Sequence, residues 1–418
     1  MSWRVFAFSA IAVLMLVVNH AAGSEDSVGV LTLRQAVAFA LEKSPELAVY
    51  SAEMRASEAR LVQAGVKPNP EASADFEDFA GSGAFTGSSQ MQTTLRLSSL
   101  VELGGKRARR REAATAARDL AGREYDLKRI DVLADVTERF IAVVAAQEGL
   151  SLAREATASA EASLRIVCQR VEAGRTSSLE EKKAAVALAR SRIEEQRAER
   201  ELAAARTRLA ATWGSATAAF DRAEAELFAL EALPALDSLL TRIADSPEIA
   251  RWATVKRLRE SEIRLARAKR TPDATLGAGA RRFEGSDDHA FVAGVSLPLP
   301  LFDRNRGGVA ESQALLEKAE AAQRAAETEW RSALSSLYQD LVSASVEVES
   351  TRREILPQAE EALRIAEQGY REARFSYLEL ADAQRTLLEV RRRHVAAATT
   401  YHLVVVEIER LTGQPLNP

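Results

Sequence analysis

Aromatic residues are scarce in this chain of 418 residues, and positive charge is not in excess. Phe, Trp and Tyr together make up 6% of it, and the formal net charge is −4. A nucleic-acid protein usually carries a basic patch or stripe, and a single-strand binder interleaves aromatic platforms with it. Neither is visible here, so we expect no nucleic-acid partner.

Histidine is also rare, and its scarcity argues against a catalytic site. The chain has four His, and His394 and His402 do not face alike on one helix. A zinc site needs three or four converging ligands. The Gly-rich stretch at 81–83 does not lie between a strand and a helix, as a nucleotide site would require. We expect no catalytic residue, no cofactor and no metal site.

Long apolar runs are confined to the N-terminus. Arg4, the apolar stretch at 5–18 and the small residues at 21–23 predict a secretory signal peptide over residues 1–23. No Cys stands directly after the cleavage site, so we expect no lipid anchor, and Cys168, the single cysteine, can form no intramolecular disulfide. No later stretch reaches the roughly 18 apolar residues of a membrane-spanning helix. If the mature chain enters a membrane, it must do so as β-strands.

The chain does contain an internal repeat. The segment at 41–48 matches 243–250, 171–175 matches 370–374, and the two copies end alike at Gly214 and Gly413, with offsets of 202 and 199 residues. Similar offsets across separated landmarks indicate a tandem duplication. We predict a first repeat at 24–214, a linker at 215–235, a second repeat at 236–413 and a tail at 414–418.

Each repeat is predicted to open with a helix and continue with two strands. The helices cover residues 33–66 and 236–270 and end at prolines. The strands cover residues 71–80 and 90–101 in the first repeat, and residues 274–284 and 289–299 in the second. They alternate apolar and polar residues, as transmembrane β-barrel strands do. A soluble hairpin with one buried face would show the same period.

The rest of each repeat is predicted to be a long helical hairpin. Apolar residues step by three and four from Val136 to Val171, without a proline. The second repeat has the same seam, in which Pro357 should introduce a kink. Turns at 173–177 and 372–376 form the two helical tips.

Together these features resemble the TolC-type outer-membrane factors over the whole mature length. The strand-to-helix corner at 101–107 is similar to that of the cobalt–zinc–cadmium efflux branch, and the corner at 299–307 is its counterpart. The corner residues of interest are Gly104, Gly105, Lys106, Pro300, Asp303, Asn305 and Gly307. We expect the Gly pairs at 104–105 and 307–308 to allow the sharp change of direction, and Asp303 or Asn305 to cap the following helix.

The resemblance implies a fold that is mainly α with a small β part, built from a duplicated helix–β-hairpin–coiled-coil unit. Three chains would form a trimeric α-barrel in the periplasm and a twelve-stranded β-barrel in the outer membrane, four strands from each chain. It further implies a passive exit duct in a Gram-negative bacterium. An inner-membrane pump of the proton-driven RND type would drive divalent metal cations through it by way of a periplasmic adaptor.

The resemblance also implies a gate at the helical tips. Tyr370 and Asp382 match gate residues of the family, Glu180 replaces an aspartate, and Phe375 with Arg374 beside it occupies the place of an arginine. The tip residues expected to contact the adaptor are Gly174, Arg175, Thr176, Ser177, Arg374 and Ser376.

Two alternatives remain open at this stage. A drug-efflux or type I secretion channel would share the same fold. A soluble periplasmic coiled-coil adaptor would contain similar helices, although one hairpin and a lipoyl-like β-domain are usual there. The duplication and the paired strands argue against the adaptor.

Overall fold

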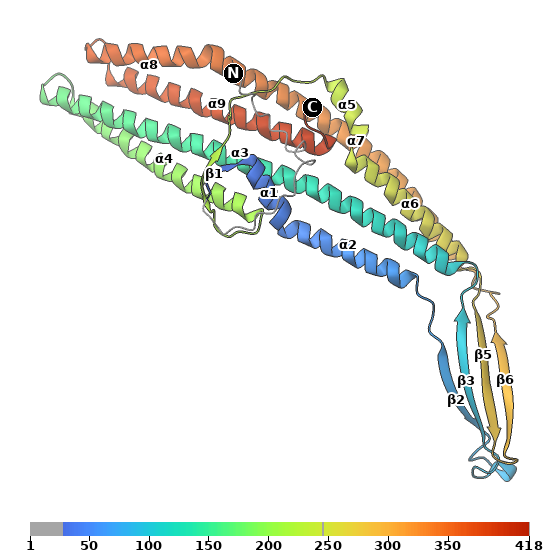
Figure 1. The fold of residues 1–418 in the computed structure, drawn as a ribbon. Helices are drawn as coiled ribbons and strands as arrows, with labels where there is room; N and C mark the ends of the chain where they lie inside the picture. The colour runs from blue at the N-terminus through green and yellow to red at the C-terminus, as the bar shows by residue number, and fades with distance from the viewer. Residues whose placement is uncertain (1–27, 245, 418) are drawn as a thin grey trace. The chain divides into compact units, whose positions relative to one another are not determined.

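The computed structural model describes residues 28–244 and 246–417, so the predicted signal peptide lies outside the described residues. Long helices dominate these residues, and six strands form two small sheets (Figure 1). The prediction of a mainly α chain with a small β part is confirmed. In the described residues, no helix is long and apolar enough to cross a membrane.

The chain divides into two compact units. One, the sheet unit, comprises residues 51–124 and 250–326. The other, the tip unit, comprises in its described part residues 28–50, 125–249 and 327–417, with the gap at 245. The unit boundaries fall inside helices α2 (Pro45–Ala64), α3 (Lys106–Glu172), α6 (Pro247–Ala268) and α7 (Arg306–Ser350).

The sheet unit contains an antiparallel sheet of four strands in the order β2-β3-β5-β6 (Figure 1). The strands are β2 (Glu71–Glu77), β3 (Gln92–Val101), β5 (Ala274–Phe283) and β6 (Asp288–Ser296); a 3-10 turn, η2 (Gly83–Phe85), lies between the first two. The pairing of β3 with β5 joins the two repeats over ten residue pairs, from Gln92↔Phe283 to Val101↔Ala274. The duplicated hairpins therefore make one sheet rather than two.

The two faces of this sheet differ in polarity. Register places Leu95, Ala280 and Phe291 side by side on one face, and the side chain of Phe291 is 97% exposed. On the other face Arg281 donates hydrogen bonds to Thr94 Oγ1 (2.8 Å), Gln92 Oε1 (3.0 Å) and Glu77 Oε2 (3.1 Å). The alternation in the sequence thus produces one apolar face open to the surroundings and one polar face.

The tip unit is built from two helical hairpins and a short parallel sheet. Its further elements are β1 (Val28–Thr32), α1 (Leu33–Lys43), α4 (Ser178–Ala211), β4 (Phe220–Glu224), α5 (Leu236–Ala244), the π-helix η3 (Thr351–Ile355), α8 (Leu356–Arg371) and α9 (Tyr377–Thr412). Strand β4 pairs with β1 and lies inside the stretch 215–235, which we expected to be a linker. A π-helical turn lies just before Pro357, where we expected a kink.

The prediction of single opening helices over 33–66 and 236–270 was wrong. Each is broken at a buried serine, Ser44 or Ser246, whose Oγ accepts a hydrogen bond from the backbone N–H three residues later. A proline follows each serine and begins the next helix, α2 or α6. Pro lacks the N–H that a continuous helix requires and suits the first helical position, so the repeated Ser-Pro pair ends one helix and starts another.

In each repeat, the glycine at the end contacts the proline of the Ser-Pro break at the start. Gly214, at the end of the first repeat, has φ +78°, and a Cβ built on it would lie 3.2 Å from Pro45 Cγ. Gly413, at the end of the second, has φ +68°, and its Cβ would collide with Pro247 Cδ. The same glycine–proline contact thus occurs once in each repeat.

Candidate gate at the helical tips

The first tip joins α3 to α4. Gly174 adopts φ +66°, its N–H donates to Val171 O (2.9 Å), and the N–H of Arg175 donates to Arg170 O (2.8 Å). Ser177 then caps α4 by accepting from the N–H of Leu179 (3.1 Å), and the Thr176 hydroxyl donates to the carboxylate of Glu180. Glu180 is therefore tied to its own turn.

The second tip joins α8 to α9 in the same way. Ala373 occupies the left-handed position with φ +61°, and the N–H groups of Arg374 and Phe375 both donate to Gly369 O (2.8 and 3.1 Å). Ser376 forms a capping box with Glu379 at the start of α9. The Phe375 ring lies against Gly369, where an added Cβ would clash with it.

The two hairpins pack together behind their tips. A buried cluster combines Val167 and Ala184 of the first hairpin with Ala366, Tyr370, Tyr377 and Leu380 of the second. Tyr370 is 1% exposed, and its ring meets that of Tyr377 edge-on at 6.4 Å. The cluster is an apolar seal between the two repeats.

Arg170 crosses from the first hairpin to the second at this cluster. Its guanidinium carbon lies 4.5 Å from the Tyr370 ring centroid, and its Nη1 donates to Tyr370 O (2.6 Å). A cation over an aromatic face is attracted by the ring quadrupole, and a charged donor strengthens the hydrogen bond. Arg170 therefore binds Tyr370 in two ways at once.

The Tyr370 hydroxyl is buried and makes no hydrogen bond to any residue that the structure describes. Burial raises the pKa of Tyr370; the Arg170 guanidinium opposes this increase and the negative charge of Glu180 adds to it. Burial likewise raises the pKa of Tyr377, with contributions from Tyr370 and Glu180. The hydroxyl of Tyr370 therefore keeps its proton and has a donor to offer.

The remaining gate candidates have local partners within the chain. Arg374 pairs with Glu372, and Asp382 pairs with Arg385, both at exposed positions. Tyr370 and Glu180 are close enough to interact electrostatically, but neither bonds directly to Arg374 or Asp382 in the described residues. A network that joins all four stays a prediction for the assembled protein.

Sequence analysis missed Arg170. Its signal was an Arg next to the apolar seam of Val167 and Val171, less than one turn before the tip. In the repeat alignment Arg170 corresponds to Gly369, so the two hairpins differ at this position. The partner of Arg170 lies 200 residues away, and no local pattern indicates that distance.

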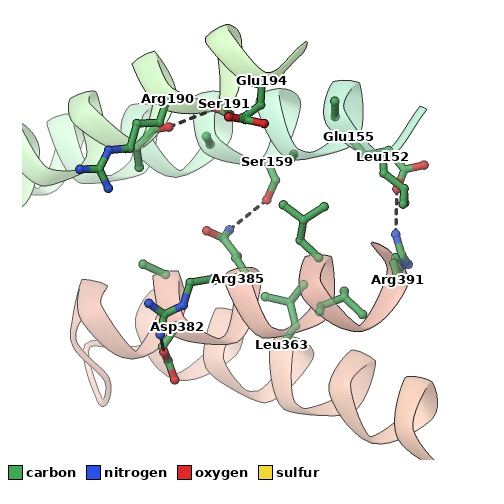
Figure 2. A pocket seen from close by; sticks show the side chains of 18 of the residues that line it. Leu152, Glu155, Ser159, Arg190, Ser191, Glu194, Leu363, Asp382, Arg385 and Arg391 are labelled. Carbon is green, nitrogen blue, oxygen red and sulfur yellow. Dashed lines mark hydrogen bonds and ion pairs between the residues drawn. The ribbon is translucent and has the colours of Figure 1, made fainter. Parts of the chain in front are cut away.

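A groove of about 630 Å³ separates the two hairpins further along the tip unit (Figure 2). Gln384 spans it by donating to Ser159 Oγ (3.0 Å) and Ser163 Oγ (2.9 Å). Arg391 bonds Glu155 (2.8 Å) on the facing hairpin and Glu360 (3.0 Å) on its own. Asp382 and Arg385 line the same groove together with apolar residues such as Leu152 and Leu363, so polar bonds cross a largely apolar groove here.

The first strand-to-helix corner has the geometry that two consecutive glycines allow. Gly104 and Gly105 have φ +67° and +70°, and a Cβ on Gly104 would lie 2.7 Å from Thr271 Cβ. Asp273 accepts from the Leu103 N–H (2.9 Å) and pairs with Lys106 (2.8 Å). Both the turn and the close contact require glycine at 104.

The second corner departs from expectation. Gly307 and Gly308 already lie in α7, and Asn305 is the left-handed residue, with φ +50°. The Asn305 amide donates to Ala266 O (2.8 Å), Asp303 accepts from the Asn305 N–H (2.8 Å), and Pro300 O accepts from Arg304. The expectation that the glycines turn the chain was therefore wrong here, because Asn also tolerates this conformation.

The described residues contain no group of three or more His, Cys, Asp or Glu placed to hold a metal ion. Both histidines of α9 are buried and have partners other than a metal ion. His394 stacks on Phe228 at 4.5 Å, and His402 Nε2 bonds Leu227 O at 2.8 Å. Burial lowers the pKa of each.

Comparison with known proteins agrees with the architecture. The family described as outer membrane efflux protein matches residues 37–215 and 241–414 of this chain. The chain belongs to the outer membrane efflux protein family. An outer-membrane location follows from that membership.

Two known proteins are similar to most of the chain. The cobalt-zinc-cadmium resistance protein CzcC of Cupriavidus metallidurans is 31% identical over 396 residues, which cover 93% of this chain and 91% of that protein. The nickel-cobalt-cadmium resistance protein NccC of Alcaligenes xylosoxydans xylosoxydans is 27% identical and covers 72% of this chain and 67% of its own.

Solved structures share the fold at lower identity. The outer membrane protein VceC of Vibrio cholerae has a TM-score of 0.75 at 19% identity and covers 92% of this chain and 97% of its own. The CmeC outer membrane channel of Campylobacter jejuni has a TM-score of 0.75 at 16% identity, with coverages of 92% and 87%.

Proposed function

We propose that the protein is the outer-membrane exit duct of an efflux system for divalent metal cations. The observation that carries this proposal is the four-stranded sheet with one exposed apolar face. Phe291, Val295, Leu95 and Leu97 are all exposed there, while Arg281 and its partners lie on the opposite face. Such a sheet suits lipid on one side and water on the other.

Three copies would complete the duct. Strands β2 and β6 each have one edge without a strand partner in the described chain. Lipid does not tolerate unpaired backbone groups, so the edges must pair with those of other copies. Three chains of four strands would close a barrel of twelve, as the resemblance implies, with the helices extending into the periplasm of a Gram-negative bacterium.

The metal cargo is inferred from the relatives. CzcC and NccC are named for resistance to cobalt, zinc, cadmium and nickel, and CzcC is 31% identical over most of both chains. The described residues offer no metal-binding cluster, which fits a conduit rather than a store. An inner-membrane pump, of the proton-driven RND type, would supply energy and selectivity.

The tips are the proposed contact with the periplasmic adaptor. Gly174, Arg175, Thr176 and Ser177 form the first turn, and Arg374 and Ser376 belong to the second. Behind them Tyr370 and Arg170 hold the hairpins together. The adaptor would open the duct by loosening that contact and the bonds that Glu180, Arg374 and Asp382 make with neighbouring copies.

Deletion of the gene tests the cargo. We expect cells to become sensitive to zinc, cobalt or cadmium and to recover when the full chain is restored. Unchanged metal tolerance with new sensitivity to dyes or detergents would favour the drug-efflux alternative. A monomer found in the soluble periplasmic fraction would contradict the duct itself and favour an adaptor.

A further inference from the structure

Four chain segments meet where the strands of the sheet unit give way to helices. We call residues 64–70, 101–111, 264–273 and 297–306 the collar. Arg110 donates to Ala64 O (2.9 Å) and Val66 O (3.2 Å), which ties the first segment to the second. Asp273 binds the Leu103 N–H, and Arg270 donates to Arg304 O (3.2 Å), which ties in the other two.

The collar is strongly basic although the whole chain is weakly acidic, with a net charge of −4. Its carboxylates are Glu102, Asp273 and Asp303. Its cations are Lys67, Lys106, Arg107, Arg109, Arg110, Arg111, Arg264, Arg267, Lys269, Arg270, Arg304 and Arg306. The collar therefore has nine more cations than carboxylates.

Some of these cations already have carboxylate partners. Lys106 pairs with Asp273, Arg110 with Glu102, and both Arg109 and Arg264 with Glu112. The other eight are exposed, and none forms an ion pair with a carboxylate in the described chain. Lys67, Arg107 and Arg306 also make no side-chain hydrogen bond there. They are free to bind an external anion.

An apolar loop lies beside these cations. The chain between β6 and α7 exposes Leu297, Leu299, Leu301 and Phe302, and Phe302 is 99% exposed. Arg304 and Arg306 follow within four residues. A soluble surface gains nothing from exposing such a run. Apolar side chains next to Arg are the pattern of a segment that lies in a lipid interface.

The opposite end of the strands has the opposite charge. The loops at 78–91 and 284–287 contain no Lys or Arg, whereas Asp78, Glu284 and Asp287 lie there and Asp288 begins β6. Arg282 of β5 pairs with Glu284 and Asp287, which leaves this end acidic. The exposed apolar face of Leu95, Phe291 and Val295 lies between the basic and the acidic end. One face of the sheet is therefore apolar between its ends, and the two ends of the strands carry opposite charge.

We propose that the collar is a binding surface for anionic phospholipid headgroups of the periplasmic leaflet of the outer membrane. Arg107, Arg306 and Lys67 bind headgroup phosphates, for which guanidinium and ammonium groups are suited. Phe302 and its neighbouring leucines enter the adjacent acyl region. This inference rests on the proposed outer-membrane duct and adds which lipid holds it and where.

Depth-dependent quenching tests the apolar loop. In the full-length protein with Cys168→Ser, a fluorophore is attached at Phe302→Cys, Val295→Cys or Ile193→Cys, and vesicles contain phosphatidylglycerol, phosphatidylcholine and a spin-labelled lipid. Val295 lies on the apolar face and Ile193 is exposed on α4. We expect quenching at 295 and 302 and none at 193. At 302, a spin label near the headgroup should quench more strongly than one deep in the acyl chain.

The outcomes separate the two proposals. Quenching at 295 without quenching at 302 would overturn the collar proposal and leave the duct intact; it would mean that a neighbouring copy or water covers the loop. Absence of quenching at both sites would contradict the duct, and the collar proposal with it.

Lipid selectivity tests the charges. Native mass spectrometry of the detergent-purified protein with equal phosphatidylglycerol and phosphatidylcholine should show preferential retention of the anionic lipid. The triple variant Lys67→Gln, Arg107→Gln, Arg306→Gln should lower that preference by at least about fivefold, which is the factor that corresponds to the roughly 1 kcal/mol contributed by a single cation near an anionic surface. The matched control is Lys183→Gln, Arg197→Gln, Arg208→Gln on α4. Equal loss in the control, or no preference in the wild type, would overturn the proposal.

Discussion

The Gln147 side chain completes the pairing of β4 by bonding both backbone groups of Ala223. Gln147 Nε2 donates to Ala223 O, and the Ala223 N–H donates to Gln147 Oε1, each at 2.8 Å. Ala223 is buried and is paired with Leu31 of β1 in the strand register. A helix side chain thus takes the place of a third strand.

Loss of this amide should destabilise the tip unit. Gln147→Ala leaves a buried N–H and a buried C=O without partners, which costs about 1–3 kcal/mol. We expect a lower denaturant midpoint for the tip unit, measured by tryptophan fluorescence. Gln196→Ala on the exposed face of α4 is the control. Equal midpoints for the two variants would mean that water replaces Gln147 at no cost.

Adding a single methyl group at either glycine–proline contact should lower stability. Gly413→Ala adds a Cβ at positive φ and against Pro247, and Gly214→Ala does the same against Pro45. We expect each to lower the free energy of unfolding by about 1–3 kcal/mol. Gly149 in α3 has open space around it, so Gly149→Ala should instead stabilise the helix by up to about 1 kcal/mol. Thermal unfolding of the three variants checks the order, and a neutral Gly413→Ala would contradict it.

Arg170 should control the closed state of the duct. Arg170→Ala removes both the ring contact and the hydrogen bond to Tyr370 O, so single-channel conductance in planar bilayers should rise. Arg165→Ala, an exposed Arg on the same helix, should leave conductance unchanged. The trimer yield should be the same in both variants. An unaltered conductance in Arg170→Ala would show that the contact only terminates the hairpin.

The predicted network with neighbouring copies is tested separately. Tyr370→Phe keeps the ring over Arg170 but removes the buried hydroxyl that lacks a partner within the described chain. If the hydroxyl belongs to the gate network of the assembled protein, conductance should rise in Tyr370→Phe and Asp382→Ala, and less in Glu180→Ala. Each charge-assisted bond lost is worth about 1.5–3 kcal/mol. Wild-type conductance in all three would restrict the gate to Arg170.

Glu409 should make stability depend on pH. It is buried, accepts from the Leu416 N–H at 2.8 Å, and burial raises its pKa to about 8. Because the folded pKa lies above the ordinary value of 4.5, the stabilising contribution of the protonated form is complete below pH 4.5 and is lost as pH rises through 8. Glu409→Gln should therefore be more stable than the wild type near pH 8 and comparable below pH 4.5, in melts across this range. The exposed Glu389→Gln is the control, and parallel profiles for the two variants would contradict the assignment.

Local signals in the sequence were sufficient for the strands and helical tips of each repeat. Alternation with period two placed strands where β2, β3, β5 and β6 lie, and the helical seam with its turns placed the tips. The expectation of one apolar strand face needed no partner, because successive side chains of any strand point to opposite sides. Such features depend on residues within a few positions of one another.

Contacts between distant segments were decided by the tertiary structure. The sequence contains Arg170 and Tyr370, Gln147 and Ala223, and Pro247 and Gly413, but each pair is separated by 76 to 200 residues. The left-handed turn at Asn305 rather than at Gly307 was also settled by packing, because the Asn305 amide reaches Ala266 O. Periodicity determines which face of a helix or strand is apolar, whereas the partner of a polar group depends on how the elements meet in space.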